Sequence, residues 1–432
     1  MKICMIGAGY VGLVSGACFA DLGNSVYCVD KNRDKIDMLN NGQIPIYEPG
    51  LYEIVKKNYT AKRLKFTTNL DSAVKFADIV FICVGTPTSK KNKSAELKYV
   101  FNVATEISKS IKKFKVIVCK STVPITTSDK IEKIIKKRVK KNLFEVISNP
   151  EFLREGDAIR DFRFPDRIVI GINEKKILRK MESLYEPLIK KGAKLFITNR
   201  RGAELIKYAS NAFLATKISF INEIANLCEV AHVDIEDVSL GIGLDKRIGG
   251  RFLRAGPAYG GSCFPKDTKA ITVTADQFKT DLSIVKSVIK SNDNRKKLLT
   301  NRIKKILLNK TKNKKVAFLG VTFKANTDDM RESSSLLMIP ELHKKGVKIN
   351  YYDPTGKKEN FSKLKNVNFY KDIKSACRKV DLIVIHTEWD EFKSIDFKKI
   401  SQNKSIKIFD MRNLYSPKKM KKLGLLYHSI GR

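Results

Sequence analysis

The chain begins with the segment Lys2-Ile3-Cys4-Met5-Ile6-Gly7-Ala8-Gly9-Tyr10-Val11-Gly12, a short apolar run followed at once by three glycines. Glycine at position 7 permits a tight turn, glycine at position 9 lets the backbone approach a pyrophosphate, and glycine at position 12 allows close packing of a helix on a strand. A helix that starts at the turn directs free amide groups toward the phosphates. The segment therefore predicts a strand, a turn and a helix that together bind a dinucleotide.

A bare glycine motif is weak evidence, but the residues after it support this interpretation. Ser25–Val29 is a second apolar run, and Asp30 follows it about 20 residues after the motif, where an acidic side chain accepts hydrogen bonds from a ribose. A carboxylate there repels a 2′-phosphate, so NAD is favoured over NADP. The alternative is that Asp30 merely caps the next helix. Thr86 and Thr122 follow later strands, at the strand ends where open α/β sheets bind ligands.

The alternation of apolar runs with helical stretches continues through the first half of the chain. This rhythm predicts a parallel, doubly wound sheet. The further predicted strands are Asp78–Val84, Val116–Cys119, Glu145–Ile147, 166–172 and Leu195–Thr198.

The pattern changes near Arg201. Glu204–Val230 lacks proline and internal glycine and has apolar residues at helical spacing, which predicts one long helix, and a second helical region covers about 266–310. A new α/β rhythm follows, with a helix at Ser333–Lys345 and strands at Lys314–Leu319, Val347–Tyr352, Leu382–Ile385 and Ile406–Phe409. We therefore expect an α/β fold in which two Rossmann-like doubly wound domains are joined by a long central helix and a helical middle region. The expected domain ranges are 1–199, 200–309 and 310–432.

Composition limits the classes of function. The net charge of +39 allows nucleic-acid binding, but the lysines are spread along the chain without a basic tail, so we expect no nucleic-acid partner. The eight cysteines form no CxxC pair and only four histidines accompany them, which argues against a zinc site or a disulfide framework. No apolar run reaches the roughly 18 residues needed to span a membrane, and the N-terminus does not resemble a signal peptide. We expect a cytoplasmic protein without a metal.

Cys263 differs from the other cysteines because of its neighbours. It lies in Gly260-Gly261-Ser262-Cys263-Phe264-Pro265-Lys266-Asp267, where proline favours the first turn of a helix. A helix N-terminus and the adjacent Lys266 both stabilise a thiolate. Asp267 lies one turn further and could accept a proton or orient a water molecule. The segment predicts a nucleophilic cysteine, and the alternative is a buried structural thiol.

Two other segments carry polar groups that could act on a substrate. Lys207 and Asn211 are four residues apart and share one face of the predicted long helix, where they could stabilise an oxyanion. By spacing alone, a solvated helix face is the stronger interpretation. The segment 149–156 follows a predicted strand, and its carboxylates Glu151 and Glu155 could do acid–base work.

Taken together, these segments resemble the UDP-glucose/GDP-mannose dehydrogenase family. The motifs that carry the resemblance are GAGYVG (7–12), GTP (85–87), STVP (121–124), NPEFLREG (149–156), PDR (165–167), Lys207 with Asn211, GGSCFPKD (260–267) and TFKANTDDMRES (322–333). They span essentially the whole chain in the order and spacing of the family. Two departures are small: the residues around Cys263 vary among relatives, and Ser335 stands where proline is frequent, from which we expect only a local effect on a helix start.

The resemblance implies an NAD-dependent, four-electron oxidation of a nucleotide sugar that uses two NAD molecules in turn. Cys263 would capture an aldehyde as a thiohemiacetal and then carry a thioester that water hydrolyses to the acid. Lys207 and Asn211 would stabilise oxyanions, while Glu155, Thr122 and Asp267 would manage protons and the hydrolytic water. UDP-glucose is the favoured substrate, and GDP-mannose or a UDP-N-acetylhexosamine is the alternative.

The resemblance also implies a set of binding residues and a homodimer. The expected NAD-binding residues are Gly7, Gly9, Val11, Gly12, Asp30, Lys35, Thr86, Thr122, Glu155, Lys266 and Arg331. The expected substrate-binding residues are Glu151, Phe152, Leu153, Arg154, Glu155, Lys207, Asn211, Arg247, Phe252, Leu253, Arg254, Ala255, Gly256, Gly260 and Lys324. Arg247 could reach a substrate phosphate across a dimer interface. Without the resemblance, Lys324 and Arg331 would be ordinary surface charges.

Overall fold

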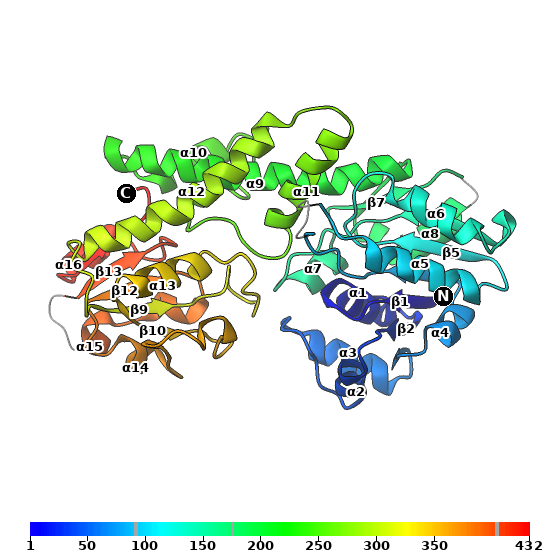
Figure 1. The fold of residues 1–432 in the computed structure, drawn as a ribbon, viewed down its shortest axis with the longest axis horizontal. Helices are drawn as coiled ribbons and strands as arrows, with labels where there is room; N and C mark the ends of the chain where they lie inside the picture. The colour runs from blue at the N-terminus through cyan, green and yellow to red at the C-terminus, as the bar shows by residue number, and fades with distance from the viewer. Residues whose placement is uncertain (90–93, 175–176, 402–405) are drawn as a thin grey trace. The chain divides into compact units, whose positions relative to one another are not determined.

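The computed structural model describes residues 1–89, 94–174, 177–401 and 406–432 (Figure 1). It divides into two compact units. The first unit contains Met1–Ser210 and Lys269–Thr280, and the second contains Asn211–Thr268 and Asp281–Arg432. The chain crosses from the first unit into the second within one long helix, α9 (Arg200–Ala231).

The first unit is built on an eight-stranded sheet with the order β3-β2-β1-β4-β5-β6-β7-β8. Strands β1 to β6 are parallel, whereas β7 meets β6 in an antiparallel bridge between Gly171 and Ser148. The order reverses direction between β1 and β4, and such a switch point is where doubly wound sheets bind nucleotides. The strands are β1 Lys2–Ile6, β2 Ser25–Val29, β3 Leu64–Thr67, β4 Ile79–Ile82, β5 Lys115–Cys119, β6 Phe144–Ser148, β7 Arg167–Gly171 and β8 Lys194–Thr198.

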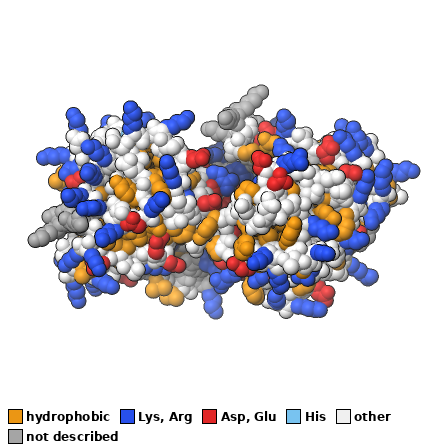
Figure 2. Space-filling view, turned by 90° about the horizontal axis from the view of Figure 1, so that it is seen from below, with side chains coloured by type: hydrophobic (Ala, Val, Ile, Leu, Met, Phe, Trp, Pro, Cys, Tyr) orange, Lys and Arg blue, Asp and Glu red, His pale blue; other side chains and the backbone are white. Residues whose placement is uncertain are grey.

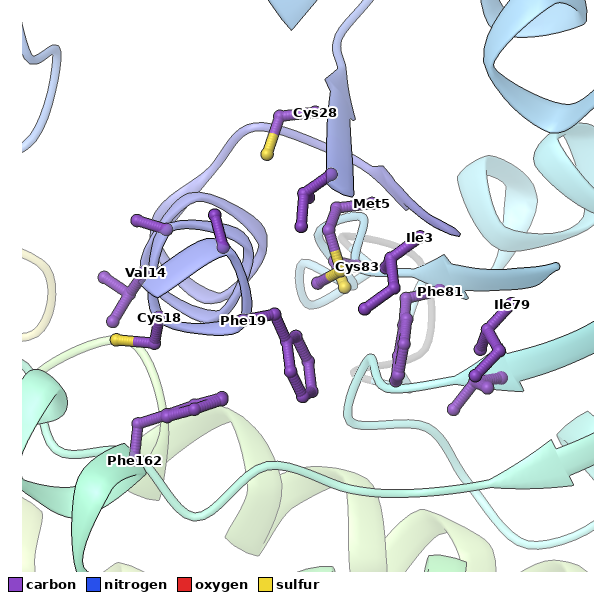
Figure 3. Packing of buried hydrophobic residues seen from close by; sticks show 14 of the residues in the cluster. Ile3, Met5, Val14, Cys18, Phe19, Cys28, Ile79, Phe81, Cys83 and Phe162 are labelled. Carbon is purple, nitrogen blue, oxygen red and sulfur yellow. The ribbon is translucent and has the colours of Figure 1, made fainter. Parts of the chain in front are cut away.

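Helices cover both faces of this sheet (Figure 1). Because successive strand residues point to opposite faces, Ile3 and Met5 of β1 enter one core while Cys4 and Ile6 enter the other. In the first of these cores Phe19 packs edge-on against Phe162 with ring centroids 4.9 Å apart (Figure 3). The helices are α1 Tyr10–Asp21, α2 Arg33–Asn40, α3 Leu51–Thr60, α4 Leu70–Phe76, α5 Lys98–Ser110, α6 Thr127–Lys136, α7 Ala158–Arg163 and α8 Leu178–Ile189.

The second unit contains a six-stranded parallel sheet with the order β11-β10-β9-β12-β13-β14. Its strands are β9 Lys315–Leu319, β10 Lys348–Tyr352, β11 Val367–Phe369, β12 Leu382–Ile385, β13 Lys407–Asp410 and β14 Leu426–His428. Besides the C-terminal part of α9, its helices are α10 Ile235–Gly243, α12 Ser283–Ile306, α13 Ser335–Lys344, α14 Ile373–Cys377, α15 Phe397–Ser401 and α16 Pro417–Lys422. Helix α11, Phe264–Gln277, begins in the second unit and ends in the first.

The expected fold class is confirmed, with two doubly wound sheets and a long central helix. The long helix begins at Arg200 rather than at Glu204. The predicted helical region 266–310 is two helices, α11 and α12, because the chain turns at Lys279, whose φ of 55° is left-handed. The domain ranges 1–199, 200–309 and 310–432 stay a prediction, since compactness alone does not assign a role to each part.

Two surface properties bear on the composition arguments. Among the described residues, no helix combines the length and the apolar character that a membrane span requires. On the face drawn in Figure 2, lysine and arginine side chains are spread widely and acidic side chains lie among them. This distribution differs from the continuous basic stripe that a nucleic-acid backbone favours.

Candidate active site

The glycine turn has the geometry that its sequence predicted. Gly7 has a φ of 104°, and a Cβ there would lie 2.7 Å from the carbonyl oxygen of Cys83. A Cβ on Gly12 would lie 1.8 Å from the carbonyl oxygen of Gly7, so only glycine fits. A Cβ on Gly9 would meet no atom within 4 Å, which leaves space beside the backbone for a ligand. Helix α1 starts at Tyr10 and carries the half-buried Val11 in its first turn. The turn therefore fits a pyrophosphate at the N-terminus of a helix.

Asp30 lies beside this turn. Its Oδ2 accepts a hydrogen bond of 3.0 Å from the Ala8 amide and forms an ion pair with Lys35 Nζ at 3.1 Å. The cap of α2 is Asn32, whose side chain accepts from the Lys35 amide, so the alternative that Asp30 caps this helix is wrong. Asp30 keeps 14% of its side chain exposed, and it can therefore still accept from a ribose.

Thr86 and Thr122 lie together at the carboxyl ends of β4 and β5. Thr86 Oγ1 donates to the carbonyl oxygen of Thr122 at 2.8 Å, and Ser121 Oγ donates to the carbonyl oxygen of Val84 at 2.7 Å. These bonds connect the loop after β5 to the loop after β4, next to the switch point of the sheet.

The predicted segment 149–156 is tied to the glycine turn by a residue that the sequence did not single out, Glu48. Its buried carboxylate accepts from the amides of Gly156 at 2.7 Å and Ala158 at 2.8 Å, and also from the hydroxyl of Tyr10. Burial raises the pKa of Tyr10, and the hydrogen bond to Glu48 adds to the rise. Glu48 thus fixes Glu155, which precedes Gly156, relative to the turn that begins α1.

Lys207 is buried and pairs with Glu151. The two side chains are 4% and 5% exposed, and Lys207 Nζ lies 3.1 Å from Glu151 Oε1. The ammonium also lies 5.2 Å from the ring centroid of Phe152, and the guanidinium of Arg167 covers the same ring at 3.9 Å. The interpretation of this helix face as solvated is therefore wrong for Lys207. The structure joins the predicted NPEFLREG, PDR and lysine motifs in one cluster.

Asn211, one turn after Lys207 on α9, is also buried. Its Nδ2 donates to Asp267 Oδ2 at 2.6 Å, and the other oxygen of Asp267 pairs with Lys266. Asp267 is fully buried, so these two partners hold its carboxylate in one position. The structure thus brings together three predicted catalytic or binding residues.

Cys263 immediately precedes α11, as the sequence predicted, and its carbonyl oxygen accepts the first helical bond from the Asp267 amide at 2.8 Å. All eight cysteines are free thiols; Cys263 is partly exposed and the other seven are buried. Its Sγ lies 3.5 Å from Ser262 Oγ. Cys263 is therefore the most exposed of the eight thiols, whereas burial raises the pKa of buried thiols such as Cys28 and Cys377, the latter to about 12.

The glycines before Cys263 pack against the predicted motif 322–333. A Cβ on Gly260 would lie 2.7 Å from the carbonyl oxygen of Glu332, and the Gly261 amide donates to the carbonyl oxygen of Arg331 at 2.8 Å. Gly261 also has a φ of 80° and lies against the ring of Phe323. Arg331 itself extends into solvent, 65% exposed, and pairs with Asp329. The two motifs form one surface in the second unit.

The loop 252–256 is anchored to α9 and α12. Asn222 Oδ1 accepts from the Gly256 amide at 2.8 Å, and Arg295 Nε donates to the Gly256 carbonyl oxygen at 3.1 Å. Phe252 has a φ of 66° and Leu253 and Ala255 are buried, while Arg254 donates to the Arg412 carbonyl oxygen. Three predicted charged residues occupy more open positions: Arg247 pairs with Asp245, Arg154 pairs with Asp157 and Asp161, and Lys324 lies 5.6 Å from the Phe323 ring.

Sequence reasoning missed three buried groups near these residues: Glu48, Lys120 and Glu204. Burial lowers the pKa of Lys120 to about 8, and its ammonium donates to Asn149 Oδ1 at 3.2 Å. Glu204 had a visible signal, because it lies one turn before Lys207 on the same face of the predicted long helix. Glu48 and Lys120 act through partners far away in the sequence, which no local pattern reveals.

Comparison with known proteins decides the family. Residues 1–189 match the NAD binding domain of the UDP-glucose/GDP-mannose dehydrogenase family, residues 201–294 match its central domain, and residues 317–417 match its UDP binding domain. The chain belongs to this family. The resemblance noted in the sequence is thereby confirmed, and this dehydrogenase has NAD as its cofactor, for which the glycine turn and Asp30 provide a fitting site.

Relatives cover the full length of this dehydrogenase. It is 47% identical to the UDP-glucose 6-dehydrogenase of Rhizobium meliloti (strain 1021) over all of both chains, and 44% identical to UDP-glucose 6-dehydrogenase TuaD of Bacillus subtilis (strain 168), with 100% of this chain and 93% of that one covered. The solved UDP-glucose dehydrogenase of Pyrobaculum islandicum is 34% identical with a TM-score of 0.90, covering 99% and 96% of the two chains. The UDP-D-ManNAc dehydrogenase of Pyrococcus horikoshii is 25% identical with a TM-score of 0.87, covering 100% and 99%.

Proposed function

We propose that this enzyme is a UDP-glucose 6-dehydrogenase, which oxidises the CH2OH carbon of UDP-glucose to a carboxylate and so makes UDP-glucuronate for polysaccharide precursors. The observation that carries the proposal is the partly exposed Cys263 at the start of α11, in a chain that shares 47% of its residues with a UDP-glucose 6-dehydrogenase over its full length. The overall change is a loss of four electrons from the sugar carbon with one water added.

The NAD site is proposed to consist of Gly7, Gly9, Val11 and Gly12 at the phosphates and Asp30 with Lys35 at the ribose. Thr86, Thr122, Glu155, Lys266 and Arg331 complete the expected set. When bound, NAD supplies the acceptor for two electrons as a hydride, and two NAD molecules in succession account for all four electrons.

Cys263 keeps the intermediate attached to the protein between the two oxidations. Its thiolate sulfur forms a bond to the aldehyde carbon, and the carbonyl oxygen becomes an oxyanion that takes up a proton to give the thiohemiacetal. Loss of a hydride and a proton then leaves a thioester. A covalent intermediate retains the reactive aldehyde in the site until the second oxidation occurs.

Five further residues are proposed to handle charge and protons during these steps. Lys207 and Asn211 donate to the oxyanions, because an ammonium and an amide fixed by burial need no reorganisation as the charge develops. Asp267, held by Asn211 and Lys266, accepts a proton or orients the hydrolytic water. Water attack on the thioester breaks the carbon–sulfur bond and returns the thiol, with Thr122 and Glu155 positioning that water.

The remaining predicted residues are proposed to bind the nucleotide sugar. Glu151 to Glu155 contact the sugar, the loop 252–256 with Gly260 and Lys324 contacts the nucleotide, and Arg247 reaches a phosphate from a neighbouring copy. In this proposal residues 1–199 bind NAD, residues 200–309 supply the cysteine and the dimer contacts, and residues 310–432 bind the nucleotide, in agreement with the match of residues 317–417 to a UDP binding domain.

We infer that a second copy of the chain covers the outer face of α9. Phe213, Phe220 and Leu227 are each more than half exposed and recur at intervals of seven residues. Leu240 on α10 and Leu244, which follows this helix directly, are also more than half exposed. Large apolar side chains in such a row are typical of helix–helix association. We expect Leu227→Glu to convert a dimer into a monomer in sedimentation experiments, whereas Leu308→Glu, an equally exposed change outside this row, leaves the dimer intact.

A cytoplasmic location fits the eight free thiols, since a reducing compartment keeps cysteines unpaired. The alternative substrates are GDP-mannose and a UDP-N-acetylhexosamine. The similarity to the UDP-D-ManNAc dehydrogenase of Pyrococcus horikoshii supports the second of these. The identities of 47% to the Rhizobium meliloti UDP-glucose enzyme and 34% to the Pyrobaculum islandicum one both exceed the 25% to the Pyrococcus horikoshii enzyme, which favours UDP-glucose.

A substrate screen tests the proposal. We expect purified protein to reduce two equivalents of NAD for each UDP-glucose consumed, and Cys263→Ala to form no uronic acid while NAD affinity changes less than about twofold, because the thiol is a nucleophile and not part of the cofactor site. Cys228→Ala is the control for loss of a thiol. Turnover of another nucleotide sugar without turnover of UDP-glucose would overturn the substrate assignment, and full turnover by Cys263→Ala would overturn the mechanism.

A further inference from the structure

Glu204 is a buried carboxylate for which the proposed mechanism has no use. It lies one turn before Lys207 on α9 and is 2% exposed. Its Oε2 accepts from the Thr126 amide at 2.8 Å and its Oε1 accepts from the Ser128 amide at 2.7 Å. Thr126 and Ser128 begin α6, so this one side chain joins the start of α6 to the helix that carries Lys207.

The loop 121–126, between β5 and α6, carries Thr122. At its β5 end it is held by the hydrogen bonds from Thr86 and Ser121. At its α6 end Thr126 has a φ of 76°, a conformation that a β-branched residue adopts only where neighbouring groups hold it. The two bonds to Glu204 hold this end against α9, together with the ion pairs that Asp129 in the first turn of α6 makes with Arg200 and Arg201.

We propose that Glu204 is a positioning residue for the oxidation, whose carboxylate fixes the loop of Thr122 relative to the helix turn of Lys207. The proposal rests on the function proposed above, in which Thr122 and Lys207 act on the reacting sugar. Glu204 acts through these two residues, because its two oxygens are occupied by backbone amides of α6.

Protonation of Glu204 weakens this connection. A carboxylate accepts at both oxygens, whereas the carboxylic acid replaces one acceptor with a donor and loses one of the two amide bonds. Burial raises the pKa of Glu204 to about 7, the charge of Asp129 adds to the rise, and the amide donors oppose it. The charged or titratable groups around it are Asp129 with its partners Arg200 and Arg201, Cys119 on β5, and Lys207 in its pair with Glu151. The loop is therefore held more weakly as the pH falls through about 7.

The kinetic test compares Glu204→Gln with Glu223→Gln, the same change on the same helix at a residue whose carboxylate accepts from the side chain of Ser291. We expect Glu204→Gln to lower kcat about tenfold at pH 8 with KM values within about twofold, because misplacing groups that act on the transition state costs rate more than binding. We also expect the wild-type rate to decline below pH 7 and the rate of Glu204→Gln not to show this decline. An unchanged kcat and pH profile would overturn the proposal.

Hydrogen exchange separates this inference from the proposed function, since it needs no substrate. After correction for intrinsic rates, we expect the amides of residues 121–128 to exchange faster in Glu204→Gln than in wild type or Glu223→Gln, and faster in wild type at pH 6 than at pH 8. If the wild type oxidises no nucleotide sugar, the proposed function fails, and equal exchange in all three proteins would independently exclude the loop connection.

A second variant covers the case in which Glu204→Gln does not fold. Thr126→Gly places at this position a residue that adopts positive φ without strain, so the loop depends less on Glu204. We expect Thr126→Gly to keep at least about half of the wild-type rate at pH 8 and to show a shallower decline below pH 7. A decline as steep as that of the wild type would contradict the proposal.

Discussion

The first turn of each sheet is built on the same backbone frame. After β1 the amide of Gly7 donates to the end of β2 at 2.7 Å, and after β9 the amide of Gly320 donates to the end of β10 at 2.8 Å. The next amide in each case donates to an aspartate that follows the neighbouring strand, at 3.0 Å to Asp30 and at 2.8 Å to Asp353. Both sheets also share the strand order 3-2-1-4-5-6 over six strands.

The two turns differ in what remains available to a ligand. Asp30 is partly exposed, and α1 starts directly after the glycines. Asp353 is 1% exposed and also accepts from the Thr355 amide and hydroxyl, and α13 starts only at Ser335, after the long segment that packs on Gly260 and Gly261. The same frame therefore leaves room for a dinucleotide in the first unit, where we propose that NAD binds, and is taken up by internal structure in the second. The strand order alone does not indicate which of the two turns binds a nucleotide.

Substitutions of glycine in the two turns should differ most in their effects on NAD affinity and on stability. Gly9→Ala adds a methyl group that meets no protein atom within 4 Å, so the fold should keep its stability while the methyl group blocks the pyrophosphate. We expect NAD affinity to fall roughly 100-fold, or about 2.7 kcal/mol, with an unchanged melting temperature. Titration of NAD and thermal unfolding measure the two effects.

Gly320→Ala is the counterpart in the second unit. Its φ is 74° and a Cβ would lie 2.4 Å from Thr387 Cβ, so we expect a loss of roughly 2 kcal/mol or more in unfolding free energy and an unchanged NAD affinity. A Gly320→Ala protein that binds NAD much more weakly would contradict the assignment of NAD binding to the first turn and of a structural role to the second.

The aspartates give a smaller contrast of the same kind. Asp30→Asn should weaken NAD binding about tenfold, because hydrogen bonds to a charged acceptor are worth about 1.5–3 kcal/mol, and it should change stability little at a partly exposed site. Asp353→Asn should lower the unfolding free energy by roughly 3 kcal/mol, since it leaves buried donors and Lys358, 3.6 Å away, without their carboxylate. Calorimetric NAD titration and denaturant unfolding of both variants would check this, and equal NAD affinities for the two would contradict it.

The sequence predicted the first turn well because each of its features is local. Gly7, Gly9 and Gly12 lie within six positions, and Asp30 ends the next apolar run. A glycine after one strand and an aspartate after the next also occur at Leu319-Gly320 and Tyr352-Asp353. They do not predict a turn of this kind, because no second and third glycine follow Gly320. The strands β3, β11 and β14 were missed because they have three or four residues each, too few for a period to show.

The candidate site was predictable to the extent that single segments define it. Cys263 before a helix and Lys207 with Asn211 on one helix face followed from spacing, and the roles given to them came from the family resemblance. The burial of Lys207 and Asn211 could not be predicted from spacing, because their partners Glu151 and Asp267 are each 56 residues away in the sequence. The backbone partners of Glu48 and Glu204 could not be predicted for the same reason. Amides that donate to Glu48 are 108 and 110 residues away, and those that donate to Glu204 are 78 and 76 residues away.

Buried titratable groups give the smallest contrast, in which the two units respond to pH with opposite sign. Burial, with the charge of Arg412, lowers the pKa of His386 from 6.5 to about 3, so the folded state binds fewer protons than the unfolded state between these values and stability falls as the pH falls below 6.5. The raised pKa of Glu204, about 7 against 4.5 unfolded, acts in reverse, because its folded state binds more protons and stability is lost as the pH rises toward 7.

These two contributions oppose each other between pH 5.5 and pH 7, each at about 1–2 kcal/mol, so the wild type should show little net change in this window. We expect the free energy of unfolding of His386→Asn to be higher at pH 5.5 than at pH 7, because only the contribution of Glu204 remains. Glu204→Gln should show the reverse, with stability rising by about 1 kcal/mol from pH 5.5 to pH 7. Urea unfolding at both pH values measures the slopes, and slopes of the same sign in the two variants would show that burial does not set these two protonation states.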